Sequence, residues 1–199
     1  MLTLYDLSLN INGHNFFRHL SVTCFGGCIL KINGANGSGK TSLLRMIAGI
    51  QSYSGSIYFK RVNIQNIAKP YCVYIGHNLG IRTDLTVLQN LLFWSQIYHS
   101  DLLINSAIKY WNLESLLDMP CSDLSKGNLK KVALARLLSC NSDVWLLDEV
   151  DNNLDFNNLT LLNNLLYAKI NSGGIVILTS HNHTKLKYMN ILELSSFIK

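Results

Sequence analysis

The eight residues from Gly34 to Thr41 read GANGSGKT, and they constrain the fold more than any other part of the chain. An apolar run from Cys28 to Asn33 precedes them, and TSLLRMIAGI follows with apolar residues at helical spacing. A strand, a glycine-rich loop and a helix in this order gather unpaired backbone N–H groups at one helix N-terminus. The run matches the pattern G-x-x-x-x-G-K-[ST] and predicts a cradle for phosphate groups.

Each residue type in this loop has a physical role. Glycines leave no Cβ between a backbone amide and a phosphate, and they adopt backbone angles that other residues avoid. Lys40 is expected to reach the β- and γ-phosphates of a nucleotide, and the Thr41 hydroxyl to ligate Mg²⁺. The predicted nucleotide ligands are Gly34, Ala35, Asn36, Gly37, Ser38, Gly39, Lys40, Thr41 and Ser42. The alternative is a glycine-rich turn that precedes Lys-Thr by chance.

Two later strands end in polar side chains. VWLLDE ends in Asp148, which we expect to hold Mg²⁺ directly or through water, and in Glu149, which would orient or deprotonate the attacking water. GIVILTSH ends at His181, a predicted γ-phosphate contact, because open α/β sheets bind ligands at the carboxyl ends of their strands. The alternatives are two solvated acids and a structural histidine.

Composition bounds the rest. With 199 residues, 48% of them apolar, the chain suits one α/β domain with a real core. The net charge of +5 comes without a dense basic run, so no nucleic-acid partner is expected. No apolar stretch is long enough to span a membrane, and the first residues lack a signal-peptide pattern, which predicts a cytoplasmic protein. The five cysteines are odd in number and scattered, and we interpret them as small buried side chains.

The hydrophobic pattern predicts the organisation of the chain. Alternating or continuous apolar runs predict strands at 2–9, 21–25, 28–33, 71–76, 143–149 and 174–180, with a strand pair in SGSIYFKRVNI. Residues 78–139 are expected to form an inserted helical subdomain, and 1–77 with 140–199 the nucleotide-binding core of a single domain. The predicted fold class is α/β, with a mostly parallel sheet and an N-terminal antiparallel β part.

The stretch LSKGNLKKVALARLL opens a predicted helix at Ser125, and the order of all these motifs resembles the ATP-binding subunits of ABC transporters. Leu124–Asn128 stands where that family has Leu-Ser-Gly-Gly-Gln. The resemblance covers essentially the whole chain. It implies that Ser125 and Gly127 contact an ATP held by the P-loop of a second copy, in a head-to-tail sandwich dimer. The simpler alternative makes Ser125 an ordinary helix cap.

The chain also departs from the family pattern. Lys126 and Asn128 replace the first glycine and the glutamine of the signature. His77 stands where a glutamine is expected after the 71–76 strand, and by resemblance it contacts magnesium-bound water. Phe16 is the ring nearest to the position where the family stacks adenine, and Asp155 matches the acidic loop residue that links the two sites.

One branch of the family fits better than the others. YIGHNLGIRTDLTVLQNLLFW, with its histidine at 77, resembles the corresponding segment of CcmA, the ATP-binding subunit of the haem exporter in c-type cytochrome maturation. The resemblance implies membrane partners like CcmB and CcmC, and a peripheral place on the cytoplasmic face of the bacterial inner membrane. The chain has no Cys-x-x-Cys-His motif, so it is not expected to bind haem directly.

Three other functions are compatible with these motifs. They are the ATP-binding subunit of another ABC transporter, a soluble ABC-type ATPase acting on nucleic acid, and a non-hydrolysing regulatory subunit. The second class usually carries two cassettes or long coiled coils, and Glu149 and His181 argue against the third. A set of aromatic residues in the helical insert suits a groove for a short helix of a membrane subunit, with the alternative for each ring that it belongs to the core: Phe93, Trp94, Tyr98, Tyr110 and Trp111.

Overall fold

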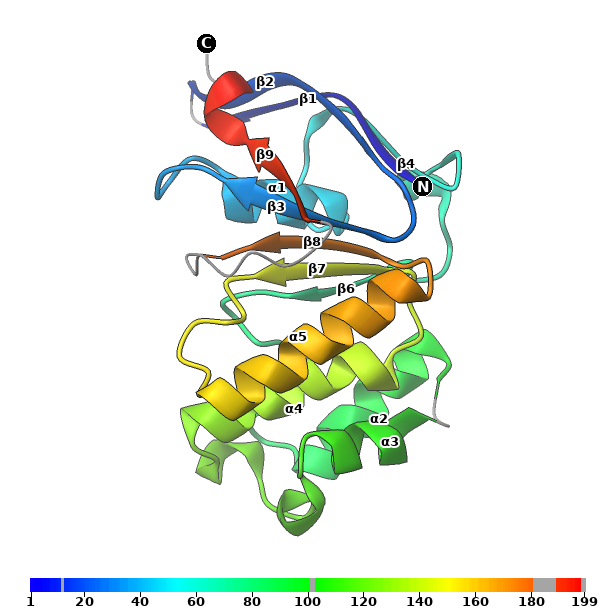
Figure 1. Cartoon of the computed structure of the whole chain (residues 1–199), viewed down its shortest axis with the longest axis vertical. Coiled ribbons are helices and arrows are strands. Elements are labelled where there is room, and N and C mark those ends of the chain that lie inside the picture. Colours follow the sequence, from blue (N-terminus) through cyan, green and yellow to red (C-terminus); the bar gives the residue numbers. More distant parts are fainter. Residues whose placement is uncertain (12, 101–102, 181–188, 198–199) are drawn as a thin grey trace.

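The computed structural model describes residues 1–11, 13–100, 103–180 and 189–197, and it contains two sheets (Figure 1). Sheet A is antiparallel, with the strand order β2 (His14–Cys24), β1 (Leu2–Ile11), β4 (Ser54–Phe59) and β5 (Val62–Asn63). Sheet B is parallel, with the order β6 (Cys72–Ile75), β7 (Val144–Asp148), β8 (Ile175–Thr179), β3 (Cys28–Asn33) and β9 (Met189–Glu193). The predicted fold class is confirmed.

Helices fill the space on both faces of sheet B. Helix α1 (Lys40–Ile47) packs into the core shared with sheet A, and α5 (Phe156–Asn171) and α4 (Lys126–Ser139) cover the opposite face (Figure 1). Helices α2 (Val87–Tyr98) and α3 (Ile104–Tyr110) pack against α4 on the side away from the sheet. Residues 78–139 thus contain α2, α3 and α4, while their division from the rest as a subdomain stays a prediction.

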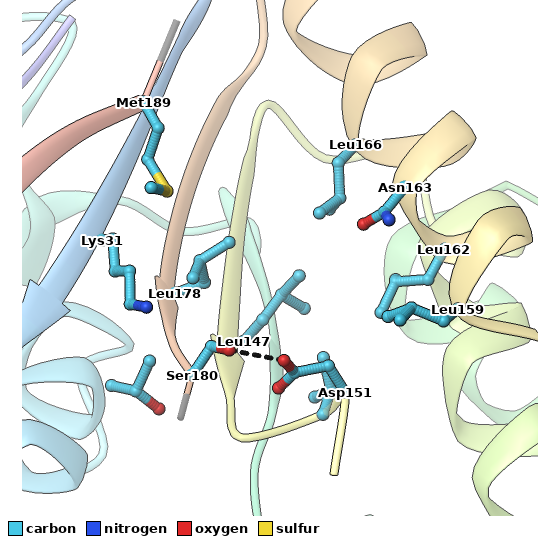
Figure 2. Close-up of a pocket in the computed structure, with 12 residues that line it drawn as sticks. Lys31, Leu147, Asp151, Leu159, Leu162, Asn163, Leu166, Leu178, Ser180 and Met189 are labelled. Carbon is cyan, nitrogen blue, oxygen red and sulfur yellow. Dashed lines mark hydrogen bonds between the residues drawn. The ribbon is translucent and has the colours of Figure 1, made fainter. Parts of the chain in front are cut away.

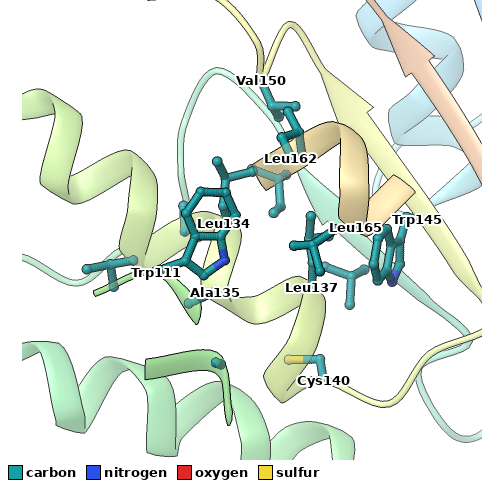
Figure 3. Close-up of a cluster of buried hydrophobic side chains, with 14 of the residues drawn as sticks. Trp111, Leu134, Ala135, Leu137, Cys140, Trp145, Val150, Leu162 and Leu165 are labelled. Atoms are coloured by element: carbon teal, nitrogen blue, oxygen red, sulfur yellow. The ribbon is translucent and has the colours of Figure 1, made fainter. Parts of the chain in front are cut away.

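The alternation of side chains along β7 explains why its sequence is apolar from Val144 to Leu147. Val144 and Leu146 point into the core with sheet A and α1, whereas Trp145 and Leu147 point into the core under α4 and α5. Figure 3 shows Trp145 beside Leu165 of α5 in the second core. A strand covered on both faces needs no polar positions, so the continuous apolar runs correctly predicted parallel strands.

The structure differs from the predicted strands in two places. The strand expected at 21–25 extends from His14 to Cys24. Its first half was missed because its polar side chains lie on the exposed face of sheet A and interrupt the hydrophobic pattern. Strand β9 was not expected at all. It is an edge strand of sheet B, and of its residues only Leu192 is buried, so its sequence has little hydrophobic pattern.

The aromatic residues of the helical insert do not form one exposed set. Trp111 is 0% exposed and lies in the core beside Leu134 of α4 (Figure 3), and Trp94, Tyr98 and Tyr110 are partly buried against the same core. Phe93 alone of the five is exposed. The hydroxyls and the indole of the partly buried residues bind backbone carbonyls, which anchors them within the chain. Trp111 is therefore a core residue and cannot belong to a partner groove, whereas a groove that uses others of the five stays a prediction.

The cysteines are mostly buried and all are free. Cys28 is half-buried, and a hydrogen bond from the Cys24 thiol lowers its pKa to about 7. Its partner Cys24 has a raised pKa, through the same hydrogen bond and through burial. Across the described ranges, none of the helices combines the length and the apolar character that crossing a membrane requires.

Candidate active site

The glycine-rich loop between β3 and α1 forms a cradle open at the helix N-terminus. Gly39 caps α1 with φ 96°, a left-handed conformation, and a Cβ there would lie 3.4 Å from Phe16 and Phe17. Among the described residues, no side chain caps this end of α1 by a hydrogen bond, and its first turn has no acidic residue. Its first N–H groups are therefore available to an anion.

A cavity of about 450 Å³ lies over this cradle. Its lining residues are Phe16, Asn36, Gly37, Gly39, Lys40, Thr41, Ser42 and Glu149. The Ser38 hydroxyl is buried at the loop and has no hydrogen-bond partner among the described residues. Buried polar atoms are normally paired, so this hydroxyl and the uncapped helix fit a site built for phosphate oxygens.

Lys40 is held over the loop by the loop itself. Its ammonium donates hydrogen bonds to the carbonyl oxygens of Gly34, at 2.8 Å, and Ala35, at 3.0 Å. This places a positive charge at the cavity wall beside the N-terminus of α1. Both features favour a negatively charged group in the cavity.

Asp148 ends β7 at the floor of the site, and its side chain is 4% exposed. The Thr41 hydroxyl donates to one carboxylate oxygen at 2.8 Å, and the Thr179 hydroxyl donates to the other at 2.7 Å. The pairing of β7 with β8 brings Asp148 and Thr179 side by side. A carboxylate and a hydroxyl in contact next to a phosphate cradle supply the oxygen ligands that Mg²⁺ prefers.

Glu149 follows Asp148 and lines the cavity. Its φ of 54° turns the chain sharply after the strand, and its N–H donates to the carbonyl of Thr179 at 3.1 Å and to the hydroxyl at 3.0 Å. The Asn152 side chain donates to carboxylate oxygen Oε2 at 3.0 Å. The carboxylate is thus fixed at the edge of the cavity, where a proton acceptor is needed.

Other predicted site residues lie elsewhere or outside the described ranges. Ser125 and Gly127 are exposed at the start of α4 and are not among the residues that line the cavity. The Ser125 hydroxyl accepts the Asn128 N–H at 3.2 Å, so the helix-cap alternative is correct for the single chain. His77 is exposed after β6, and His181 lies outside the described residues.

Sequence reasoning missed two residues that hold the carboxylates. Thr179 bonds both Asp148 and the Glu149 backbone, and it belongs to the β8 run whose carboxyl end was already singled out. Asn152 lies three residues after Glu149, in an asparagine-rich loop that carries no specific signal. Asp155, expected to link two sites, caps α5 by accepting the Asn158 N–H at 2.7 Å.

Solved structures with a similar fold are ATP-binding proteins. A putative ABC transporter ATP-binding protein from Pyrococcus furiosus superposes with a TM-score of 0.83 at 22% identity, covering 100% of this chain and 99% of that one. The ATP-binding subunit of another ABC transporter superposes with a TM-score of 0.86 at 20% identity, covering 97% of this chain and 87% of that one. At these identities the likeness supports the fold alone.

Sequence comparisons identify the family. The ABC transporter family model matches residues 17–152. The chain is 54% identical to the cytochrome c biogenesis ATP-binding export protein CcmA of Rickettsia bellii, over 98% of this chain and 100% of the relative. It is 39% identical to the protein of that name from Wolbachia pipientis, over 93% of this chain and 91% of the relative. The chain therefore belongs to the ABC transporter family and, within it, to the group of ATP-binding proteins named CcmA.

Proposed function

We propose that the chain hydrolyses ATP to drive a membrane complex that serves cytochrome c biogenesis, with haem as the cargo or as part of it. The observation that carries the ATPase is that Lys40, Thr41 and Glu149 line one cavity at the N-terminus of α1, where Thr41 donates a hydrogen bond to Asp148. The biogenesis role rests on the names of the relatives. Release of inorganic phosphate from ATP by the purified complex tests the proposal, and chelation of Mg²⁺ should stop it.

The residues of the cavity divide the chemistry among them. Lys40 and the loop N–H groups bind the phosphates and offset their charge. Thr41 and Asp148 would hold Mg²⁺, which when bound polarises the phosphate oxygens. Glu149 orients the attacking water and accepts its proton. The half-exposed ring of Phe16 lines the same cavity and is our candidate for stacking on the adenine.

A second copy would complete this site. Gly127 is in the first turn of α4, yet a Cβ built there meets nothing closer than the Ser125 hydroxyl at 3.9 Å. Nothing in the described part of the chain therefore requires a glycine, which normally weakens a helix. A nucleotide bound to another copy and lying against the N-terminus of α4 would explain the glycine. Its phosphates would have to approach the helix N–H groups closely, and a Cβ at residue 127 would prevent that.

Gly127→Ala separates stability from function. We expect the variant to unfold at the same or a higher temperature, because alanine favours the helix by up to ~1 kcal/mol. We expect its ATP turnover to fall by at least ~10-fold, because the added methyl group keeps the opposing phosphate away. Calorimetry and steady-state phosphate release measure the two effects. Lys126→Gly in the same turn is the comparison and should change turnover by less than ~10-fold. Unchanged turnover in Gly127→Ala would contradict the shared site.

The membrane subunit is proposed to dock in a separate groove. A cavity of about 870 Å³ runs from the end of α1 to α2, and its lining includes Ile50, Ile67, Tyr71, Trp94 and Tyr98. Trp94 and Tyr98 are two of the five aromatic residues expected at a partner groove. Ile50 is 63% exposed, and the wall is largely apolar and aromatic. We propose that this groove receives a short helix from an integral membrane subunit resembling CcmB, with a subunit resembling CcmC in the same complex.

Ile50→Glu tests this groove. A charge in the groove should reduce co-purification of the membrane subunit by at least ~10-fold while nucleotide binding by the chain stays unchanged, because Ile50 does not line the nucleotide cavity. The matched control is Val62→Glu on β5, where another exposed aliphatic side chain lies outside the groove. If both variants retain the membrane subunit equally, the docking site lies elsewhere. The same partner would hold the chain at the cytoplasmic face of the bacterial inner membrane.

A further inference from the structure

The loop after β7 is held in place by its own backbone turns. The Asn152 N–H donates to the Glu149 carbonyl at 3.3 Å, and the Leu154 N–H donates to the Asp151 carbonyl at 3.4 Å. The Asn152 side chain reaches back to the Glu149 carboxylate. Asn152 therefore closes the turn through its backbone N–H and orients the Glu149 carboxylate through its side-chain amide.

Helix α4 contacts the same loop through a lysine side chain. Lys130 lies on the first turns of α4, and its ammonium donates a hydrogen bond to the backbone carbonyl of Asn152. Burial lowers the pKa of Lys130, while the nearby Asp151 carboxylate acts in the opposite direction. The Lys130 ammonium is thus partly buried, and it donates its hydrogen bond to the loop.

A third attachment comes from the end of β8. The Ser180 hydroxyl donates to the Asp151 carboxylate, beside a cavity of about 30 Å³ between β8 and α5 (Figure 2). The loop is therefore tied to α4 by Lys130, to β8 by Asp151 and to Glu149 by Asn152. A carboxylate at the end of such a chain of contacts has little freedom to turn.

We propose that Asn152 and Lys130 are positioning residues for Glu149. Asn152 fixes the carboxylate directly, and Lys130 fixes Asn152 from α4. This inference rests on the proposed role of Glu149 as proton acceptor. The proposal would also link the two sites of a head-to-tail dimer. In such a dimer, the N-terminus of α4 at Ser125 would contact the nucleotide bound to the second copy. Through Lys130 and Asn152, the same helix positions Glu149, which acts on the nucleotide bound to its own chain.

Asn152→Asp tests the direct contact. The variant keeps the shape of the side chain but replaces the donor with a carboxylate that repels Glu149. We expect kcat for ATP to fall by at least ~10-fold with KM changed by less than ~3-fold, because misplacing a catalytic group affects the chemical step. Asn153→Asp is the matched control, an exposed asparagine one residue along. Equal kcat in the two variants, or a loss confined to KM, would overturn the proposal.

Lys130→Met tests the link to α4. Methionine keeps the apolar stem and removes the donor, and we expect kcat to fall by about 5-fold or more with KM little changed. Lys130→Arg should restore at least half of the loss in log kcat, because its guanidinium also donates to a carbonyl. Lys131→Met, the next lysine on α4, is the control and should match the wild-type chain. Wild-type kcat in Lys130→Met, or no rescue by arginine, would show that this contact does not position Glu149.

Glu149→Gln, measured in the same assay, distinguishes a wrong catalytic role of Glu149 from a wrong positioning role of Asn152 and Lys130. If it hydrolyses ATP normally, the proposed function has the wrong proton acceptor, and the positioning inference fails with it. If it is inactive while Asn152→Asp and Lys130→Met keep the wild-type kcat, the proposed function stands and only the inference fails. Thermal unfolding of each variant shows whether a loss of activity reflects loss of the folded state.

Discussion

Glu149→Gln should stop ATP hydrolysis while leaving ATP binding intact. The amide has the shape of the carboxylate but cannot accept a proton from water, so kcat should fall by at least ~100-fold, within the range attributed to a general base. The cavity walls that hold the phosphates are unchanged, so the affinity for ATP should change by less than ~3-fold. Phosphate release measures the first quantity, and equilibrium binding of a fluorescent ATP analogue measures the second.

Glu114→Gln is the control for that experiment. It makes the same chemical change at an exposed glutamate beyond α3, outside the residues that line the nucleotide cavity. It should hydrolyse ATP at the wild-type rate. Comparable turnover by Glu149→Gln and Glu114→Gln would mean that another group accepts the proton, and that the position of Glu149 beside Asp148 has a different purpose.

Lys40→Ala should remove nucleotide-dependent activity by acting on binding as well as on the chemical step. The ammonium now held by the Gly34 and Ala35 carbonyls is the only lysine or arginine charge among the residues that line the cavity. Losing a charge-assisted contact to a phosphate costs ~3 kcal/mol, which corresponds to at least ~100-fold in kcat/KM. Steady-state kinetics across a range of ATP concentrations measures it.

Lys109→Ala, at an exposed lysine in the last turn of α3, provides the comparison. It removes the same charge from the molecule without touching the loop between β3 and α1. Near-normal turnover in Lys40→Ala would mean that the phosphates bind somewhere other than at this loop. Weak turnover in both variants would point to net charge, and not to the contact, as the cause.

The sequence predicted those parts of the fold in which the pattern of neighbouring residues matches their burial or their function in the folded chain. The strands β6, β7 and β8 are apolar at their buried positions up to Asp148 and Thr179, which end β7 and β8 at the site, because both faces of sheet B are covered. Such runs are recognisable without a structure. The loop from Gly34 to Thr41 was predictable because phosphate binding demands those residue types at that spacing. The start of α4 was predictable from Ser125, a good helix cap.

The parts that were missed depend on contacts between distant segments. β9 pairs with β3 across more than half of the chain, and its exposed edge leaves no periodic pattern. Trp111, which follows α3, is fully buried in a core that also contains residues of α4 and α5, and no local pattern around it reveals this. Such burial is a property of the assembled core.

The same limit applies within the site. Glu149 was identified from its place after a buried strand, whereas Asn152, which holds its carboxylate, was not. Asparagine is common in loops for its local turn preferences, so its presence in an asparagine-rich stretch carries no functional signal. Phe16 illustrates an intermediate case. Its ring was noted as nearest to the expected stacking position, and the structure places it on the cavity wall.

A second copy of the chain is proposed to complete the active site, and one mass measurement tests this most directly. Glu149→Gln should bind ATP without consuming it and should hold two copies together through the starts of their α4 helices. Light scattering after gel filtration should give 22.4 kDa without nucleotide and about twice that mass with ATP and Mg²⁺. The double variant with Lys40→Ala should stay at the single-chain mass. A single-chain mass for Glu149→Gln at saturating ATP would contradict the shared site.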